Sequence, residues 1–247
     1  MIPHIIHYCW FGGKKLPRTA RKCIRSWKKY CPGWEIRRWD ETNVDLDSHP
    51  FLKEALEAGK YAFATDIVRL QVLLKYGGLY MDTDVELIRP LDDLMTGEGF
   101  MGFEPARHGD VLVATGLGCA AVPEQRLIKM LLADYDGAHF RKEDGSYDVT
   151  ACTTRNTEFL KTLGLRTDNT EQTILGIRIL PSEYLCPKNT FTGETHITPN
   201  THSIHHYAMS WLTSKEKNSY RRNRFVYWLK KSAFGRFIVR VKKKIVG

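Results

Sequence analysis

A helical pattern that runs directly into an acidic strand constrains the fold most. Apolar residues recur at helical spacing between Tyr61 and Tyr76, at positions 62, 67, 70, 73 and 74. Gly77 and Gly78 follow, and glycine readily takes the left-handed turn that ends a helix. The next run, residues 79–88, is apolar apart from its acidic positions and predicts a strand closed by Arg89 and Pro90. A helix that leads into an apolar strand is typical of an α/β domain.

The amino-terminal segment predicts a second unit of the same kind. Residues 2–10 are rich in β-branched and aromatic side chains, helical spacing follows Pro17, and residues 34–39 indicate another strand. Strand, helix and strand in this order favour a right-handed parallel crossover. Further strands are predicted at 101–103, 111–122, 177–180 and 203–206, with helices at 123–135 and 157–163 and a polar loop at 136–150. Because neither a repeat nor a linker divides them, residues 1–214 are expected to form one mixed α/β domain.

The composition is that of an ordinary globular protein. Of 247 residues, 43% are hydrophobic and 26% charged, which excludes disordered and fibrous classes. No run reaches the roughly 18 to 20 apolar residues that cross a bilayer, and the start lacks a secretory pattern, so a cytoplasmic protein is expected. The six cysteines contain no C-x-x-C pair, which argues against a zinc knuckle or a disulfide framework.

Positive charge is concentrated at the carboxyl end. The net charge is +9, yet residues 215–247 hold twelve Lys or Arg against the single acid Glu216, and residues 1–214 are nearly neutral. If residues 234–245 are helical, apolar and basic residues fall on opposite sides, as in an interfacial helix. The sequence therefore predicts a basic tail, 215–247, that contacts an anionic membrane surface. The alternative is a helix packed on the body with solvated lysines.

An acidic tripeptide lies within the predicted strand at 79–88. In a regular strand Asp82 and Asp84 would both point to one side, with Thr83 opposite. Both carboxylates can serve one binding site only if that side is open to a ligand, as it is where a strand ends or bends. Paired carboxylates suit Mg²⁺ or Mn²⁺, which can neutralise a diphosphate leaving group. Asp66 and Arg69 share a face of the preceding helix and could reach the same place. The alternatives are solvated acids at a strand end and a surface ion pair.

Three spaced elements resemble the DXD-containing glycosyltransferases of family 32, which are related to the large clostridial toxin glucosyltransferases. Residues 64–84 are similar to the signature D-x-x-R followed by G-G-x-Y-x-D-x-D. Residues 2–13 resemble the opening strand and glycine turn of that family, and residues 205–211 resemble its closing H-x-x-x-S-W element. The resemblance spans roughly residues 1–211 and is faint between about 105 and 200.

The resemblance implies a GT-A type, Rossmann-like domain that binds a nucleotide diphosphate sugar and Mn²⁺ (or Mg²⁺). By this resemblance Trp10 stacks on the nucleobase, Tyr80 lies against the nucleoside, and Asp66 and Arg69 hold hydroxyls of the donor sugar. Asp82 contacts the ribose or sugar and a metal-bound water, and Asp84 ligates the metal directly. The residues that close over the metal and diphosphate are His206, with His205 as the alternative register, Ser210 and Trp211.

The predicted function is that of a metal-dependent retaining hexosyltransferase. A uridine diphosphate sugar is favoured as donor, because a pocket stacked by Trp10 suits a pyrimidine, and a guanosine donor is the alternative. The predicted acceptor is a lipid-linked saccharide in capsular or other surface polysaccharide synthesis, at the inner membrane face. Front-face attack is favoured over a covalent intermediate.

Two rival functions were weighed against this one. An aspartyl-phosphate phosphohydrolase also carries D-x-D after a strand, but Glu86 stands where that class has Thr or Val. A nucleic-acid-binding protein would use the basic tail, but the neutral body lacks the charge to track phosphates, so no nucleic acid partner is expected.

Overall fold

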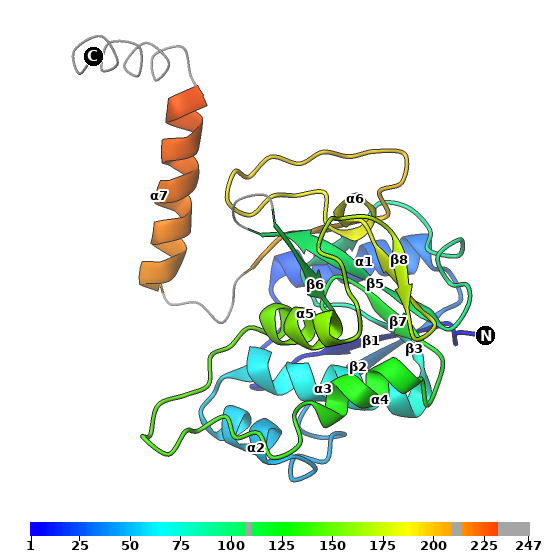
Figure 1. Cartoon of the computed structure of the whole chain (residues 1–247), viewed down its shortest axis with the longest axis vertical. Helices are drawn as coiled ribbons and strands as arrows, with labels where there is room; N and C mark the ends of the chain where they lie inside the picture. The colour runs from blue at the N-terminus through cyan, green and yellow to red at the C-terminus, as the bar shows by residue number, and fades with distance from the viewer. Residues whose placement is uncertain (107–109, 209–213, 232–247) are drawn as a thin grey trace.

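The computed structural model describes residues 1–106, 110–208 and 214–231 (Figure 1). The amino-terminal unit consists of β1 (Ile5–Cys9), α1 (Arg18–Tyr30) and β2 (Glu35–Trp39). β1 and β2 pair in parallel, from Ile5 opposite Glu35 to Cys9 opposite Trp39. Helix α1 turns Ala20, Cys23 and Trp27 inward, as its apolar spacing requires. The predicted parallel crossover is confirmed.

The central helix is buried on almost every side. After α2 (Pro50–Glu57), α3 (Tyr61–Tyr76) has the predicted bounds. Ten of its residues are buried, among them the charged Asp66 and Arg69. The helix ends at Gly77, where φ is 62° and a Cβ would lie 2.7 Å from Pro123 Cδ, so that glycine is required both by the turn and by the close packing.

The predicted strand 79–88 is wrong in one respect, because the chain turns within it. β3 (Gly78–Tyr80) joins the main sheet, whereas β4 (Val85–Leu87) pairs antiparallel with β10 (Ser203–His205) in a separate two-stranded sheet. Asp82 N donates to Gly116 O at 2.9 Å and Val85 N donates to Asp82 O at 3.0 Å, so the tripeptide forms the turn between the two sheets. Because the chain turns here, both carboxylates lie at the junction of the two sheets.

The remaining elements complete a mixed sheet. Among the described residues eight strands take part, in the order β2-β1-β3-β7-β5-β9-β8, with β6 paired to β5. Both parallel and antiparallel pairs occur. The elements not yet named are β5 (Gly99–Pro105), β6 (Val111–Ala114), β7 (Cys119–Ala121), α4 (Arg126–Ala133), α5 (Cys152–Thr162), β8 (Gln172–Ile174), β9 (Ile177–Leu180), α6 (Ser182–Leu185) and α7 (Ser214–Lys231).

Helices cover the sheet (Figure 1), and two apolar cores lie between the packed elements. One core contains side chains of α2, α3, α4 and α5, including Leu52, Ile67 and Leu160. The other contains side chains of α1, α6 and β4, including Trp27, Leu185 and Val85. The predicted mixed α/β sheet flanked by helices, the arrangement expected for a GT-A type domain, is therefore confirmed. Helices α2 and α6 and strand β8 were not predicted.

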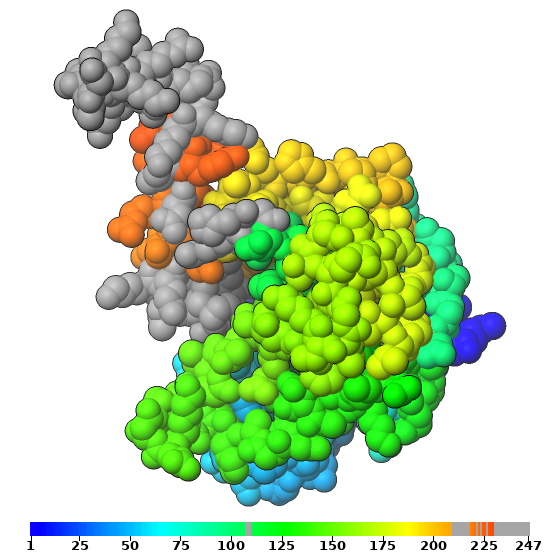
Figure 2. Space-filling model, in the orientation of Figure 1, coloured from blue at the N-terminus to red at the C-terminus, as the bar shows by residue number. Residues whose placement is uncertain are grey.

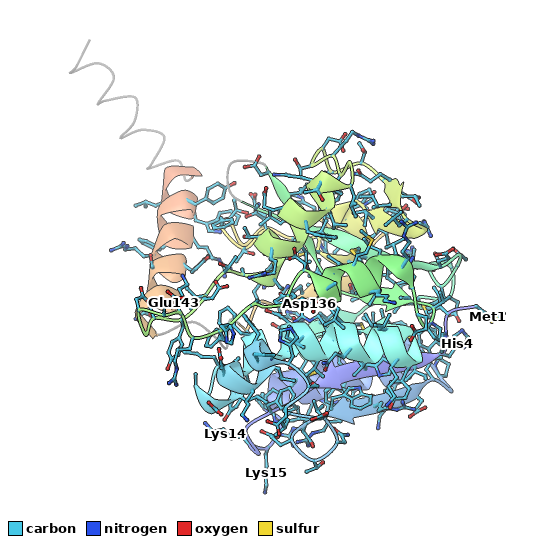
Figure 3. The ribbon with its side chains drawn as sticks, turned by 60° about the horizontal axis from the view of Figure 1, so that its bottom comes forward. Met1, His4, Lys14, Lys15, Asp136 and Glu143 are labelled. Atoms are coloured by element: carbon cyan, nitrogen blue, oxygen red, sulfur yellow. The ribbon has the colours of Figure 1, made fainter. Side chains whose placement is uncertain are left out.

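The parallel strands β1 and β3 bring two predicted site segments to one edge. Their register sets His7 opposite Tyr80, so Trp10 and Asp82 both follow the carboxyl ends of neighbouring strands. Figure 3 shows the direction of β1, with Met1 and His4 at one side of the molecule and Lys14 and Lys15 on the loop at the other. This edge is where ligands bind in open α/β sheets.

Helix α7 contacts the loop that precedes β10, and Figure 2 shows it lying against that part of the chain. The rings of Tyr220 and Phe191 are 5.8 Å apart, and Tyr227 donates a hydrogen bond of 3.0 Å to Glu194. None of the helices that the structure describes combines the length and hydropathy needed to cross a membrane. The predicted amphipathic segment 234–245 lies outside the described residues.

Candidate active site

The turn after β3 carries Asp82 and Asp84 on partly buried side chains. Asp82 is held from three directions: its N–H bonds to Gly116, its Oδ1 accepts from Tyr80 Oη at 3.0 Å, and Arg69 Nη2 lies 3.4 Å from the same oxygen. Glycine at position 116 leaves room for this carboxylate, since a Cβ there would overlap Asp82 Oδ2. Burial raises the pKa of Asp82 despite the nearby Arg69.

Asp84 is enclosed by the segment after β10. His205 Nε2 lies 3.3 Å from Asp84 Oδ1, and Ala208 N donates to Oδ2 at 2.6 Å. Burial acts to raise the pKa of Asp84, but the His205 charge and these hydrogen bonds outweigh burial and hold the pKa at about 2. The pKa of His205 is raised well above its ordinary value, because Asp84 outweighs the effect of burial. The two residues therefore form a charged pair.

The histidine beside the acidic turn is His205 and not the predicted His206. β10 pairs with β4 so that His205 stands opposite Val85, and side chains alternate along a strand. His206 consequently faces away and lies 2.7 Å from Glu86 Oε2, with Nε2 as the nearer atom. The expectation that His206 stands at the metal side does not fit this geometry, and the alternative register does.

Asp66 and Arg69 form a buried pair rather than the surface ion pair considered as the alternative. Arg69 is 4% exposed and Asp66 6% exposed, and Arg69 Nη2 lies 3.2 Å from Asp66 Oδ1. Burial raises the pKa of Asp66 to about 6, although Arg69 acts in the opposite direction. Among the buried atoms of the described residues, Arg69 Nε and His205 Nδ1 have no hydrogen-bond partner. Unsatisfied buried groups of this kind are typical of functional sites.

The two predicted aromatic residues differ in accessibility. Tyr80 is 1% exposed, and the Arg69 guanidinium lies 5.0 Å from the centre of the tyrosine ring. The Tyr80 hydroxyl donates to Asp82 and so orients that carboxylate. Trp10 is partly buried at the carboxyl end of β1, where its Nε1 donates to Lys14 O at 2.5 Å. Ser210 and Trp211 lie outside the described residues.

Other side chains at this edge of the sheet were not identified from the sequence as candidate site residues. Glu104 is the next-to-last residue of β5 and lies near Asp82 and His205, and burial raises its pKa to about 7. Arg69 Nη1 donates to Thr115 Oγ1 at 3.0 Å and approaches Cys152 Sγ at 3.4 Å. Each of these residues lies in a part of the sequence where no spaced motif was recognised. Only the tertiary structure therefore identifies them as neighbours of the site.

A divalent cation fits the donor set. One ligand atom from each of Asp82, Asp84 and His205 lies within 4.8 Å of the others. Two carboxylates and an imidazole are hard and borderline ligands, which suit Mn²⁺ well and Mg²⁺ less well. The unpartnered Nδ1 of His205 shows that the protein does not already satisfy this side chain.

Comparison with known proteins agrees with the motif. The family described as the glycosyltransferase sugar-binding region containing the DXD motif matches residues 17–101. An uncharacterized glycosyltransferase of Acanthamoeba polyphaga mimivirus is 32% identical over 106 residues, which cover 40% of this chain and 42% of that protein. Inositol phosphoceramide mannosyltransferase 1 of Schizosaccharomyces pombe is 24% identical over 107 residues, 40% of this chain and 33% of that protein. The match thus spans less than half the length of either relative.

Solved structures give distant matches. The PaToxG glycosyltransferase has a TM-score of 0.47 and 18% identity, covering 65% of this chain and 69% of its own. A glycosyltransferase involved in glycosylation of the major capsid of PBCV-1 has a TM-score of 0.45 and 12% identity, covering 90% and 99%. The acidic turn and the buried Asp66 and Arg69 all lie within the matched family region. Residues 17–101 of this chain are therefore similar to the sugar-binding region of the DXD-containing glycosyltransferases.

Proposed function

We propose that the chain is a metal-dependent glycosyltransferase that transfers a hexose from a nucleotide diphosphate sugar to a saccharide acceptor with retention of anomeric configuration. The observation that carries the proposal is the meeting of Asp82, Asp84 and His205 beside the buried Asp66 and Arg69. A cation site next to a buried carboxylate and guanidinium can hold a diphosphate and a sugar together.

The cation, Mn²⁺ or Mg²⁺, would be held by Asp84, Asp82 and His205. When bound, it supplies positive charge that stabilises the diphosphate as it departs. Asp84 remains ionised at any physiological pH, as its pKa of about 2 requires. His205 has to give up its proton to act as a ligand, so cation binding would compete with protons there.

The donor sugar would lie against Asp66 and Arg69. A carboxylate accepts hydrogen bonds from sugar hydroxyls, and a guanidinium donates to paired oxygens. Trp10 would stack on the base, and a uridine diphosphate sugar is favoured because a pyrimidine suits a single stacking ring. Tyr80 would act indirectly, by orienting Asp82, because it is too buried to be a nucleoside platform.

Acceptor attack is proposed to occur on the same face from which the diphosphate leaves. The leaving phosphate oxygens then take the proton of the acceptor hydroxyl, so no protein base is needed. A covalent route would need a carboxylate at the anomeric carbon. Glu104, which interacts electrostatically with His205 and Asp82, is one candidate for that role.

A lipid-borne saccharide at the inner membrane face is proposed as the acceptor, in surface polysaccharide synthesis. Helix α7 exposes Phe225 by 68%, Trp228 by 50% and Leu229 by 41%, and Arg222 is exposed on the same helix. Apolar and basic side chains together favour contact with anionic lipid. One relative is named for mannosyl transfer to inositol phosphoceramide, which supports a lipid-borne acceptor. On this proposal residues 1–214 are the catalytic domain and 215–247 the membrane-binding tail.

The test is a panel of nucleotide sugars with and without Mn²⁺, read by thermal shift and by nucleotide diphosphate release. One donor should raise the melting temperature and be turned over only with the cation. Asp84→Asn should abolish both effects, and Asp144→Asn, which removes an exposed carboxylate elsewhere, should not. Proton NMR of the product would give the anomeric configuration. A complete lack of Mn²⁺-dependent shift and turnover across the panel would refute the proposal.

A further inference from the structure

The Arg69 guanidinium is fixed by more groups than the two acids of the motif. Its Nη1 donates to Thr115 Oγ1 at 3.0 Å, while its Nη2 faces Asp66 and Asp82 at 3.2 and 3.4 Å. At 4% exposure the side chain has almost no water to replace a lost partner. Its orientation therefore depends on a hydroxyl as well as on the carboxylates.

Thr115 belongs to the segment between β6 and β7 that also supports Asp82. It directly follows β6 and precedes Gly116, whose carbonyl accepts from Asp82 N at 2.9 Å. One dipeptide thus touches the arginine through a side chain and the aspartate through the backbone. A shift of this segment would move both groups at once.

Asn156 holds Thr115 from the other side. Its Nδ2 lies 3.3 Å from Thr115 Oγ1, and both residues are buried, at 2% and 1% exposure. A hydroxyl oxygen has two acceptor positions, and Arg69 and Asn156 take both. Hydrogen bonds therefore join three buried side chains: Asn156 of α5, Thr115 between β6 and β7, and Arg69 of α3.

We infer that Thr115 and Asn156 are positioning residues that hold Arg69 in the orientation needed for the sugar of the donor. Neither touches the cation ligands with its own side chain in the described residues. They act through Arg69, and the inference rests on the proposed role of Arg69 at the donor sugar. Replacing Thr115 by Val keeps the shape and removes the acceptor, so that Arg69 and Asn156 both lose a partner.

The matched control is Thr157, a second buried threonine, which hydrogen-bonds to β6. Its Oγ1 accepts from Val113 N at 2.8 Å and donates to Thr153 O at 2.6 Å, and it does not contact Arg69. Thr157→Val also removes a hydrogen bond between α5 and β6. It reports what a merely structural loss does to the enzyme.

The experiment compares Thr115→Val, Thr115→Ser, Asn156→Ala and Thr157→Val with the full chain. Donor kcat and KM are measured, together with binding of the nucleotide sugar and of the nucleotide diphosphate alone. Thr115→Val is expected to lower kcat/KM roughly 10- to 100-fold. It should weaken binding of the nucleotide sugar but not binding of the nucleotide diphosphate alone. Thr115→Ser, which keeps the hydroxyl, should retain most of the wild-type kcat/KM.

Each of the following results supports or overturns the inference. Asn156→Ala should give a smaller loss in the same parameters, and added to Thr115→Val it should cost little more, because both act on one contact. If Thr115→Val does not fold, Asn156→Ala and Thr115→Ser carry the test, since both keep the Thr115 oxygen. Equal effects of Thr115→Val and Thr157→Val, or equal weakening of nucleotide and nucleotide sugar, would overturn the inference. Failure of the wild-type chain to bind any nucleotide sugar would instead refute the proposed function.

Discussion

The guanidinium of Arg69 lies against the carboxylate of Asp82, with Nη2 and Oδ1 separated by 3.4 Å, although the two residues belong to different elements. Helix α3 supplies the arginine, and the turn after β3 supplies the aspartate. The contact joins the buried Asp66 and Arg69 to the proposed cation site. On the proposed function, one connected set of charges would hold the sugar and the diphosphate.

Replacing Arg69 by Met should damage both stability and catalysis. Removing the guanidinium leaves Asp66 buried without its charge partner, which costs about 3–5 kcal/mol of unfolding free energy. Donor kcat/KM should fall roughly 100-fold if the fork stabilises developing charge. Urea unfolding and steady-state kinetics measure the two effects.

The control for Arg69 is Arg166→Met. Arg166 is an exposed partner of Asp168, and its side chain is 61% accessible, so its loss should cost roughly 0–1 kcal/mol. Activity should stay at the wild-type level. Equal stability and activity for the two variants would mean that the buried pair has no special role.

Gly116→Ala should disturb Asp82 without unfolding the protein. The added methyl group would overlap Asp82 Oδ2, while the backbone of residue 116 does not need positive φ. The carboxylate must move, so Mn²⁺ affinity is expected to fall roughly tenfold or more. Gly102→Ala is the control, because the atoms nearest its Cβ would belong to the Leu185 side chain, with Cδ1 at 3.0 Å, and not to the candidate site. Wild-type Mn²⁺ affinity in Gly116→Ala would contradict the placement of Asp82.

Protonation of His7 should weaken the fold in mild acid. Trp39 Nε1 donates to His7 Nδ1 at 3.0 Å, and the other ring nitrogen lies 2.8 Å from Gly77 O, so the buried ring is neutral. Burial lowers the pKa of His7 from 6.5 to about 4. Above pH 6.5 neither state binds this proton, whereas between pH 6.5 and 4 only the unfolded state does, so stability falls as the pH falls.

The expected loss from His7 is about 3 kcal/mol between pH 6.5 and pH 4. Other groups also titrate, including Glu104, whose raised pKa acts in the opposite direction. The contribution is therefore taken as the difference between wild type and His7→Gln in urea unfolding at pH 7, 6 and 5. The variant should be less stable at pH 7 and should lose less on acidification. Parallel curves for the two proteins would show that His7 is not the group responsible.

Membrane association should depend on the exposed side chains of α7. Phe225→Ser with Arg222→Glu should reduce sedimentation with vesicles that contain anionic lipid, and high salt should reduce wild-type binding as well. Ile197→Ser, which removes a side chain that is 60% exposed on the body, should have no effect. Unchanged vesicle binding by the α7 variant would exclude this surface.

Local patterns predicted the elements that nearby residues determine. The bounds of α3 follow from its periodicity and from Gly77, and the β1-α1-β2 unit follows from alternating apolar runs with glycine and proline between them. The sharp turn at Asp82 was not predicted, because residues 79–88 are apolar on both sides of it. Only the pairing of β4 with a strand near residue 204 makes the chain leave the main sheet there.

The candidate site was partly predictable for the same reason. Asp66, Arg69, Asp82 and Asp84 stand in one spaced motif, whereas the choice between His205 and His206 depends on strand register across 120 residues. Thr115 and Asn156 are isolated polar residues whose importance comes from burial beside Arg69. No pattern along the sequence distinguishes them from other polar residues.

The most direct measurement is a Mn²⁺ titration of the wild-type chain and its variants, followed by electron paramagnetic resonance of the free ion in the presence of uridine diphosphate. Wild type and His206→Ala should bind one ion alike, and Asp84→Asn and His205→Ala should bind it at least roughly tenfold more weakly. Wild-type affinity in Asp84→Asn, or a loss in His206→Ala with none in His205→Ala, would contradict a cation site formed by Asp82, Asp84 and His205.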